Sequence, residues 1–432
     1  MPKTHHCRSA LLLAALALAA PALATPTFHA LGFLPSGFDS NGWVSGNGLV
    51  VAGYCSQPGG YRAFRWTEAG GMVNLGTVDG FTFSRGAGVS FDGSAIAGVA
   101  GSGPAAQAAR WTQADGFQLL GLLPGTTHSY AQGISGDGRT VVGYSGDNVG
   151  GSSTGFRWSA DTGDMSPLNP GPGGGAGLSS AYAVCDDATV VAGTSGGGAA
   201  IRAARWTIAG ETTPQILDPL PGDTSSAAYG ISADSRVIVG YSGNANRQRA
   251  FRWTTLGGMV NIGAVGSGGL ATALACNADG SVIVGTSYIP AVFNSVAFIW
   301  TEAGGIADLN TYLTSRGVNL TGWTLTSAGS VSHDGRTIAG IGTHNGSSEA
   351  WTVTLDAPGP TACSLADVAS LGGGTTPDGA LTSDDVIVFL SAFFAGNPIA
   401  DVAILGGAAG HDGQFTADDL ILFLGTFFAG CP

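Results

Sequence analysis

The last 70 residues contain the side chains best suited to bind a metal ion. Residues 366–398 are repeated as residues 400–432, and each copy places an Asp/Gly segment before an Asp-Asp pair and an apolar run. A hard cation such as Ca²⁺ takes several oxygen ligands and needs a glycine where its loop turns sharply. The same aspartates could instead cap the helices that the apolar runs predict. The sequence leaves both interpretations open.

The two Asp/Gly segments resemble the calcium loop of the EF-hand type that dockerins use. Asp378 and Gly379 match the fifth and sixth loop positions. A twelve-residue loop would begin at Gly374, which has no side-chain oxygen, so Asp367 and Asp401 can be first ligands only in an expanded loop. The resemblance implies these metal ligands: Asp367, Asp378, Thr382, Asp385, Asp401, Asp412, Thr416 and Asp419.

The tandem units that end in "FFAGCP" resemble a GC-type dockerin of exported bacterial proteins. This resemblance implies a small α-helical domain over residues 363–432, Ca²⁺ as its cofactor, and a cohesin-like or cell-surface protein as its partner. Two short helices that are apolar almost all round cannot bury that surface fully against each other, and exposed apolar surface often marks a partner site. Cys363 and Cys431 bracket the domain and could form a disulfide after export. The alternative is a self-contained domain that only caps the chain.

The rest of the chain offers few catalytic patterns. "GSSTG" (151–155) and "GTSGG" (193–197) match the spacing of a nucleophile elbow, but no helical pattern follows either. No lysine occurs after residue 24, which excludes the usual phosphate-binding loop. The histidines after that point show no zinc spacing: His29, His128, His333, His344 and His411. We therefore predict no catalytic residues and a protein that is not an enzyme.

Composition and the N-terminus indicate an exported β-protein. Glycine supplies 73 of 432 residues, and only 10% of residues are charged. Residues 1–24 have a basic start, a short apolar run and a small-residue cleavage site, as in a signal peptide. Loss of Lys3 and Arg8 leaves 14 basic against 29 acidic residues, which argues against nucleic acid as a partner. No later segment resembles a transmembrane span, so we predict an extracellular or cell-surface location.

A repeat of about 47 residues sets the fold class. Seven tryptophans mark it, namely Trp66, Trp111, Trp158, Trp206, Trp253, Trp300 and Trp351. Each copy has a turn dipeptide such as Asp137-Gly138, which suits a two-residue hairpin, followed by a β-branched stretch. One period reads as four short strands, the content of one β-propeller blade. The sequence therefore predicts an all-β seven-bladed propeller over residues 25–356, a linker over 357–362, and the C-terminal helical domain.

The two ends of the repeat array complement each other. The last copy lacks a fourth strand, whereas residues 27–32 read as a fourth strand without a blade. Pairing the two would close the ring and cover the edges that an open array exposes. An open solenoid of hairpins is the alternative. In a closed ring, the tryptophans would pack blade against blade.

The repeat also resembles the HAF repeat of extracellular bacterial proteins. Its pattern "A-x-G-I-S-x-D-G-x-x-V-V-G-Y-S" followed by "A-F-R-W-T" covers roughly residues 28–355, and the third and fifth copies match best. The fourth copy departs at "VCDDATVVAG", and the seventh has an insert at residues 310–323. Because that family has no settled activity, the resemblance supports the fold more than a function.

Variable loops predict where a ligand would bind. The loops between second and third strands, and those between blades, share one face and vary in sequence, unlike the turns at the other face. The candidate binding residues are Arg247, Arg249, Tyr288, Phe293, Tyr312 and Arg316. The function predicted is a tethered, non-enzymatic binding scaffold with a glycan or protein ligand. The alternative is an extracellular polysaccharide-active enzyme carried by the dockerin-like domain.

Overall fold

The computed structural model describes residues 26–147, 152–171, 178–196, 201–208, 213–244, 247–266, 269–290 and 294–355, with short segments between 383 and 424. The chain divides into two units, one of which is Thr25–Leu355 and the other of which contains Asp356–Pro432. The signal peptide predicted over residues 1–24 lies outside the described residues.

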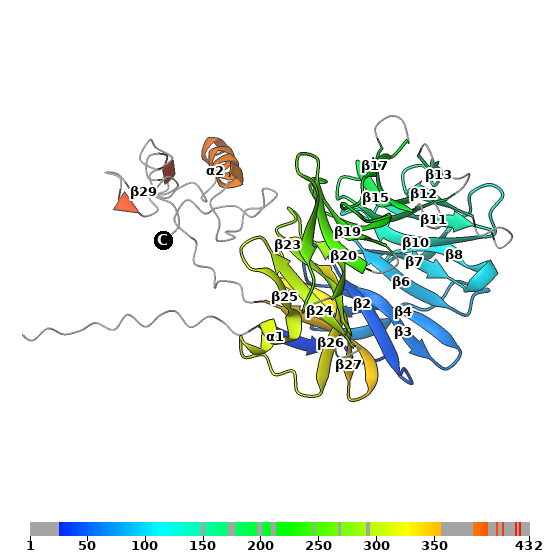
Figure 1. Ribbon diagram of the computed structural model, residues 1–432. Coiled ribbons are helices and arrows are strands. Elements are labelled where there is room, and N and C mark those ends of the chain that lie inside the picture. Colours follow the sequence, from blue (N-terminus) through cyan, green and yellow to red (C-terminus); the bar gives the residue numbers. More distant parts are fainter. Residues whose placement is uncertain are drawn as a thin grey trace, which may run out of the picture. The chain divides into compact units, whose positions relative to one another are not determined.

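Seven antiparallel sheets of four strands each build the first unit (Figure 1). In the order of the blades, the innermost strand first, they are β2 (Asp39–Val44), β3 (Val51–Gln57), β4 (Gly60–Thr67) and β5 (Gly71–Asn74); β6 (Ser84–Val89), β7 (Ala95–Ala100), β8 (Gln107–Thr112) and β9 (Gly116–Gly121); β10 (His128–Ile134), β11 (Thr140–Gly146), β12 (Ser153–Ser159) and β13 (Met165–Leu168); β14 (Ser179–Val184), β15 (Val190–Ser195), β16 (Arg202–Thr207) and β17 (Gln215–Leu217); β18 (Ser225–Ile231), β19 (Val237–Asn244), β20 (Arg247–Thr254) and β21 (Gly258–Gly263); β22 (Leu270–Cys276), β23 (Val282–Ile289), β24 (Asn294–Thr301) and β25 (Gly305–Asp308); and β26 (Trp323–Val331), β27 (Thr337–His344), β28 (Ser347–Thr354) and β1 (Thr27–Ala30). This is a seven-bladed β-propeller, as predicted.

The N-terminal strand β1 closes the ring. It pairs antiparallel with β28, with Thr27 opposite Thr354 and Ala30 opposite Trp351, so the blue first strand lies in the last blade (Figure 1). The backbone N–H of Leu31 continues the pairing to the carbonyl oxygen of Ala350 at 3.0 Å. The predicted closure by residues 27–32 is therefore confirmed, and the open solenoid is excluded.

The turns between the first and second strands follow one scheme that differs from the predicted two-residue hairpin. In the third blade, the N–H of Gly138 donates to the Ser135 carbonyl, and Gly138 alone of the Asp-Gly pair has a positive φ. The Asp137 carboxylate accepts from the Ser135 hydroxyl and from the N–H of Arg139. The two-residue assignment was wrong because these side-chain bonds stabilise a longer loop. The geometry of the turn therefore explains the Asp at this position.

The repeated tryptophans pack between neighbouring blades. Trp158, Trp206 and Trp351 are almost fully buried. Trp206 of the fourth blade, for example, shares a core cluster with Val142 and Leu168 of the third blade. Burial of such large apolar plates at each junction stabilises the ring by the hydrophobic effect. The tryptophans therefore have the structural role that was predicted.

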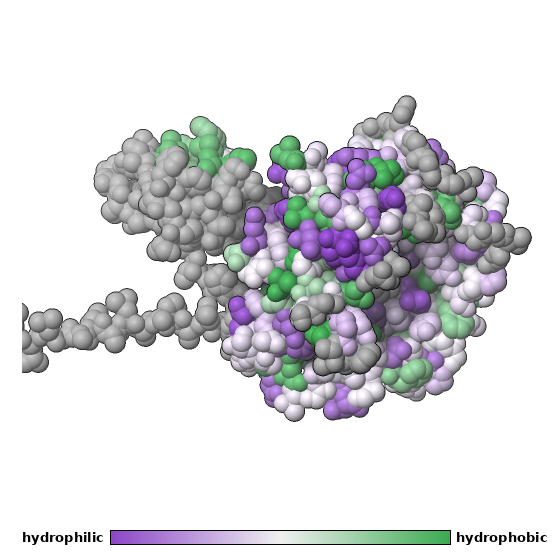
Figure 2. Space-filling model, viewed as in Figure 1, coloured by the Kyte–Doolittle hydropathy of each residue, from purple (hydrophilic) through white to green (hydrophobic). Residues whose placement is uncertain are grey.

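Two helices and a short 3₁₀ turn, η1 (Gly103–Ala105), complete the described elements. Helix α1 (Leu309–Thr314) is formed by the insert between the sixth and seventh blades, and Asp308 caps it by accepting from the N–H of Asn310 at 2.9 Å. The C-terminal unit contains α2 (Ser383–Ala395) and a short pairing of β29 (Ala403–Ile404) with β30 (Ala408–Ala409). On the side shown in Figure 2, hydrophilic and apolar residues are interspersed over the propeller.

Candidate functional site

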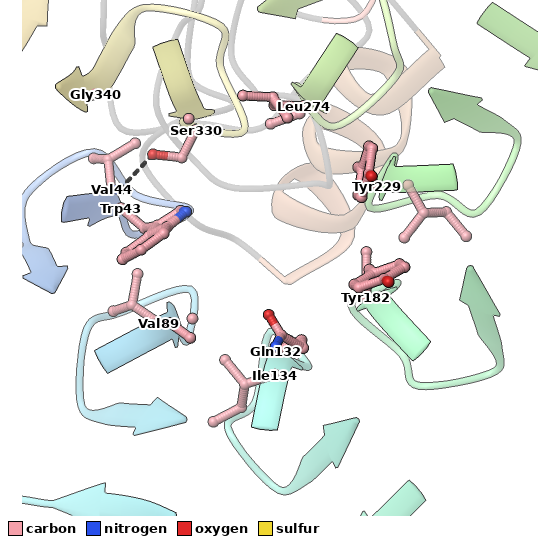
Figure 3. A pocket seen from close by; sticks show the side chains of 18 of the residues that line it. Trp43, Val44, Val89, Gln132, Ile134, Tyr182, Tyr229, Leu274, Ser330 and Gly340 are labelled. Atoms are coloured by element: carbon pink, nitrogen blue, oxygen red, sulfur yellow. Dashed lines mark hydrogen bonds between the residues drawn. The ribbon is translucent and has the colours of Figure 1, made fainter. Parts of the chain in front are cut away.

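A central channel runs between the innermost strands of the seven blades. It encloses a cavity of about 380 Å³, lined by residues from every blade. Figure 3 shows Trp43 on one side of this cavity, Tyr182 and Tyr229 on another, and Gln132 between them. The hydroxyl of Ser330 in the last blade accepts from the N–H of Val44 in the first at 2.8 Å, so the wall is continuous across the closure.

β-bulges in six of the seven blades place extra residues of the innermost strand at this channel, whereas the innermost strand of the first blade pairs without a register shift. In the third blade the register between β10 and β11 shifts between Ala131 and Gly133, which leaves Gln132 as the extra residue. Equivalent shifts make Tyr182, Tyr229 and Leu274 the extra residues of their blades. Bulges redirect side chains in this way because the extra residue has no partner in the ladder.

The second strand of every blade has a glycine that lies directly against the backbone of the innermost strand. A Cβ atom on Gly143 would overlap the carbonyl oxygen of Tyr130, and the corresponding overlap occurs in every blade. The seven glycines are Gly53, Gly98, Gly143, Gly193, Gly240, Gly285 and Gly340. Only a residue without a side chain fits against backbone at such a distance. The glycine of "V-V-G-Y-S" therefore shapes the wall of the channel.

The cavity wall is uncharged. None of its lining residues is an Asp, Glu, Lys, Arg or His. Burial raises the pKa of Tyr229 well above its usual value, with smaller contributions from Tyr182 and Tyr241. Burial likewise raises the pKa of the Cys276 thiol to about 12. Both groups are therefore neutral at physiological pH.

The opposite end of the channel is bounded by the turns that follow the innermost strands. Seven backbone hydrogen bonds connect these turns in a ring, from Asn47 N–H to the Phe91 carbonyl around to His333 N–H and the Gly46 carbonyl. His333 Nε2 lies 3.4 Å from Asp186 Oδ1, and the ring centroids of His333 and Phe91 are 5.0 Å apart. Because Asp186 and His333 belong to the fourth and seventh blades, this contact lies across the channel mouth.

The predicted binding residues Arg247 and Arg249 have an intramolecular partner. Asp223 has a fully buried side chain, and its carboxylate accepts from Arg247 Nε at 2.6 Å and from Arg249 Nη2 at 2.7 Å. Burial opposes the charge of Asp223, but hydrogen bonds from the two arginines and from Ser242 outweigh it and lower the carboxyl pKa. The two arginines therefore neutralise a buried carboxylate of their own blade.

The other predicted binding residues lie near the same face but do not form one site. Arg316 stacks on the Tyr312 ring, with the guanidinium carbon 3.6 Å from the ring centroid. Tyr288 is half-buried near the end of β23, opposite Leu270. Phe293 lies outside the described residues.

Most of the predicted metal site lies outside the described residues. Asp385 lies in α2, and the other seven predicted ligands lie outside the described residues, as do Cys363 and Cys431. Within the described ranges, no group of three or more His, Cys, Asp or Glu residues is arranged to hold a metal ion. Cys55, Cys185 and Cys276 are free thiols. Among the helices described, none is long and apolar enough to cross a membrane.

Two variable positions inside the repeat motif mark residues of the candidate site that sequence reasoning missed. The variable residue of "A-x-G" is the bulge residue that faces the channel, as in "AYG" at 228–230. The variable residue of "S-x-D-G" lies at the turn mouth and is Phe91 or His333 in two of the blades. Comparing the seven copies position by position would have found both, because neighbouring positions hardly vary.

The fold is shared with solved β-propellers, whereas no family model and no curated protein matches the chain. An oligogalacturonate lyase from Vibrio parahaemolyticus has a TM-score of 0.53 at 11% identity, over 78% of this chain and 98% of that one. The propeller domain of the trilobed protease from Pyrococcus furiosus has a TM-score of 0.51 at 9% identity, over 74% and 94%. That domain has an open velcro topology, whereas β1 closes the ring here.

TolB from Acinetobacter baumannii gives a TM-score of 0.42 at 14% identity, and the chain covers 63% of its length. At such identities the likeness concerns the fold alone.

Proposed function

We propose that this chain is an exported, non-enzymatic binding protein whose propeller takes a small ligand in its central channel. The observation that carries the proposal is the cavity of about 380 Å³ with an uncharged wall of aromatic, amide and aliphatic side chains. Small-ligand sites are typically concave, mostly apolar, and fitted with a few polar groups, at roughly 300–1,000 Å³. The channel therefore has the size and the chemistry of a binding site.

The wall supports binding better than turnover. General acid–base catalysis needs groups whose pKa lies near the working pH. The titratable side chains of the wall, such as Tyr229 and Cys276, are shifted away from neutrality by burial. A polysaccharide-active enzyme is the second candidate, favoured by the His333–Asp186 contact at the turn mouth. The likeness to oligogalacturonate lyases adds only the fold.

The C-terminal unit serves, in the same proposal, as a calcium-dependent attachment domain for a cohesin-like or cell-surface partner. Phe389 of α2 stacks on Phe423 with ring centroids 3.8 Å apart, and both rings are fully buried. On the same helix, Phe394 and Ile387 are 83% and 59% exposed. An apolar residue left exposed beside a packed aromatic pair supports a partner surface.

A substitution that places a large side chain in the channel tests whether the propeller binds a ligand there. Ala87 is the extra residue of the bulge in the second blade and lines the cavity, so Ala87→Trp would obstruct the cavity with a residue type that the wall already carries. We expect ligand-observed NMR with a library of neutral, acidic and basic fragments to give hits that disappear in Ala87→Trp. Leu256→Ala, at a fully exposed site, is the matched control. A set of hits that is identical in all three proteins would refute the proposed channel site.

Attachment and turnover need separate experiments. Deleting residues 363–432 should move the protein from the cell-surface fraction to the medium, and an unchanged distribution would refute the tether. A reducing-sugar assay of the purified exported chain on mixed polysaccharides should stay at background. Turnover that is lost in His333→Ala would favour the enzyme.

A further inference from the structure

We infer that the channel binds the terminal ring of an uncharged glycan, which enters from the mouth opposite the His333–Asp186 contact. This inference rests on the proposed function and specifies its ligand class. It is carried by three features of the described residues: aromatic side chains that line the cavity on two sides, hydrogen-bonding groups between them, and the lack of charge in the wall.

The aromatic residues supply flat apolar surfaces. The Tyr182 and Tyr229 rings pack with centroids 5.1 Å apart, and Trp43 lies on another side of the cavity (Figure 3). The Trp43 and Tyr54 ring centroids are 6.2 Å apart. The guanidinium carbon of Arg85 lies over the Tyr54 ring, 4.3 Å from its centroid. A sugar ring has apolar C–H faces and polar edges, which match an aromatic side chain with a polar rim.

The polar groups between these rings are available to a ligand. Gln132, Tyr182 and Tyr229 line the cavity, and no hydrogen bond to their side chains occurs within the described part of the chain. A glutamine amide can donate and accept, and a protonated tyrosine hydroxyl can do both. Burial raises the pKa of Tyr229, which keeps its hydroxyl protonated. Hydroxyl groups of a sugar need this mixture of donors and acceptors.

The absence of charge in the wall discriminates between ligand classes. A phosphate, a uronate or an ammonium group would lose its hydration in the cavity without an opposite charge to offset the cost. The cavity lies at the lower end of the usual size range for small-ligand sites, which fits one ring better than a whole chain. The Phe91, Asp186 and His333 side chains lie at the turn mouth, so a longer glycan would extend from the other mouth.

Calorimetry with the mature chain and defined tetrasaccharides tests the inference. The neutral probes are cellotetraose, xylotetraose and mannotetraose, and tetragalacturonate is the charged probe of equal length. We expect at least one neutral probe to bind at concentrations up to 10 mM, and tetragalacturonate to bind at least tenfold more weakly. Trp43→Ala and Gln132→Leu should each weaken the neutral complex at least tenfold, while Leu256→Ala leaves it unchanged.

Three outcomes would overturn the glycan inference: no binding by any neutral probe, equal binding of tetragalacturonate, or binding that both channel variants leave intact. Thermal unfolding of each variant checks that it is folded. If Trp43→Ala does not fold, the binding measurement with Gln132→Leu tests the inference by itself. The fragment screen separates the two proposals. If the only fragments whose binding is lost in Ala87→Trp belong to another chemical class, the glycan inference fails but the channel remains a binding site. If Ala87→Trp abolishes the binding of no fragment, both the glycan inference and the proposed channel site fail.

Discussion

Replacing Phe28 by alanine tests whether β1 stabilises the closed ring. Phe28 is half-buried in the last blade, where its ring meets Trp323 edge-on at 5.2 Å and stacks near Trp351 at 6.3 Å. These contacts join the two ends of a ring formed by residues more than 290 positions apart. The substitution should therefore lower the stability of the whole propeller rather than that of a terminal segment.

The size of the effect follows from burial. A fully buried Phe→Ala change costs roughly 3–5 kcal/mol. Phe28 is only half-buried, but it loses two aromatic contacts worth about 0.5–1.5 kcal/mol each. We expect the free energy of unfolding to fall by about 2–3 kcal/mol. Trp351 is fully buried, so its fluorescence should also report increased solvent access.

Guanidinium titration of the mature chain measures this change, with Leu256→Ala as the control at a fully exposed position. Exposed sites of this kind usually alter stability by less than about 0.5 kcal/mol. A loss in Phe28→Ala no larger than in the control would mean that β1 does not stabilise the ring, and the closure argument would fail.

Three further predictions concern the turns, the buried carboxylate and the metal. Asp223→Asn should lower the free energy of unfolding at pH 7 by about 2 kcal/mol, below the roughly 3–5 kcal/mol of a fully buried pair, because the Arg247 and Arg249 side chains are 44% and 27% exposed. The folded pKa of Asp223 is lowered, so this stability is present above the ordinary pKa of about 4 and is lost as the pH falls through the folded pKa. A deficit of Asp223→Asn that does not shrink as the pH is lowered from 7 through the acid range would contradict this assignment. Ala188→Gly should raise stability by about 0.5–1 kcal/mol, since Ala188 has a φ of 57° where most blades have glycine; thermal melts showing a loss would refute this. Combined Asp378→Asn and Asp412→Asn should abolish Ca²⁺ binding to the mature chain, and an unchanged calorimetric stoichiometry would exclude those ligands.

The turn positions of the fourth and fifth blades show how a local departure in sequence affects the preceding blade. At three of the turns that have glycine, an arginine of the preceding blade donates to the glycine carbonyl, as Arg110 Nε does to Gly138 at 2.7 Å. At the equivalent places before Ala188 and Ser235, the buried Nε atoms of Arg157 and Arg205 have no partner among the described residues. The repeat motif predicts the turn, but the missing bond is visible only between blades.

Sequence alone determined the blade count, the four-strand period and the closure. Trp66 to Trp351 recur at a near-constant interval, and residues 27–32 supply the strand that the last copy lacks. These features are local or periodic, and every copy repeats the same information. The predicted recognition loops were a weaker inference, because variable sequence does not reveal that Arg247 and Arg249 already bind Asp223.

Tertiary structure alone decided where the candidate site lies. Gln132, Tyr182 and Tyr229 stand about 47 residues apart, each as one variable letter within a conserved-looking repeat, and ring closure directs all of them into one cavity. Asp186 and His333 are brought into contact across the channel in the same way. A sequence pattern can specify the bulge in a single blade, but only the angle between successive blades determines which side chains face one another.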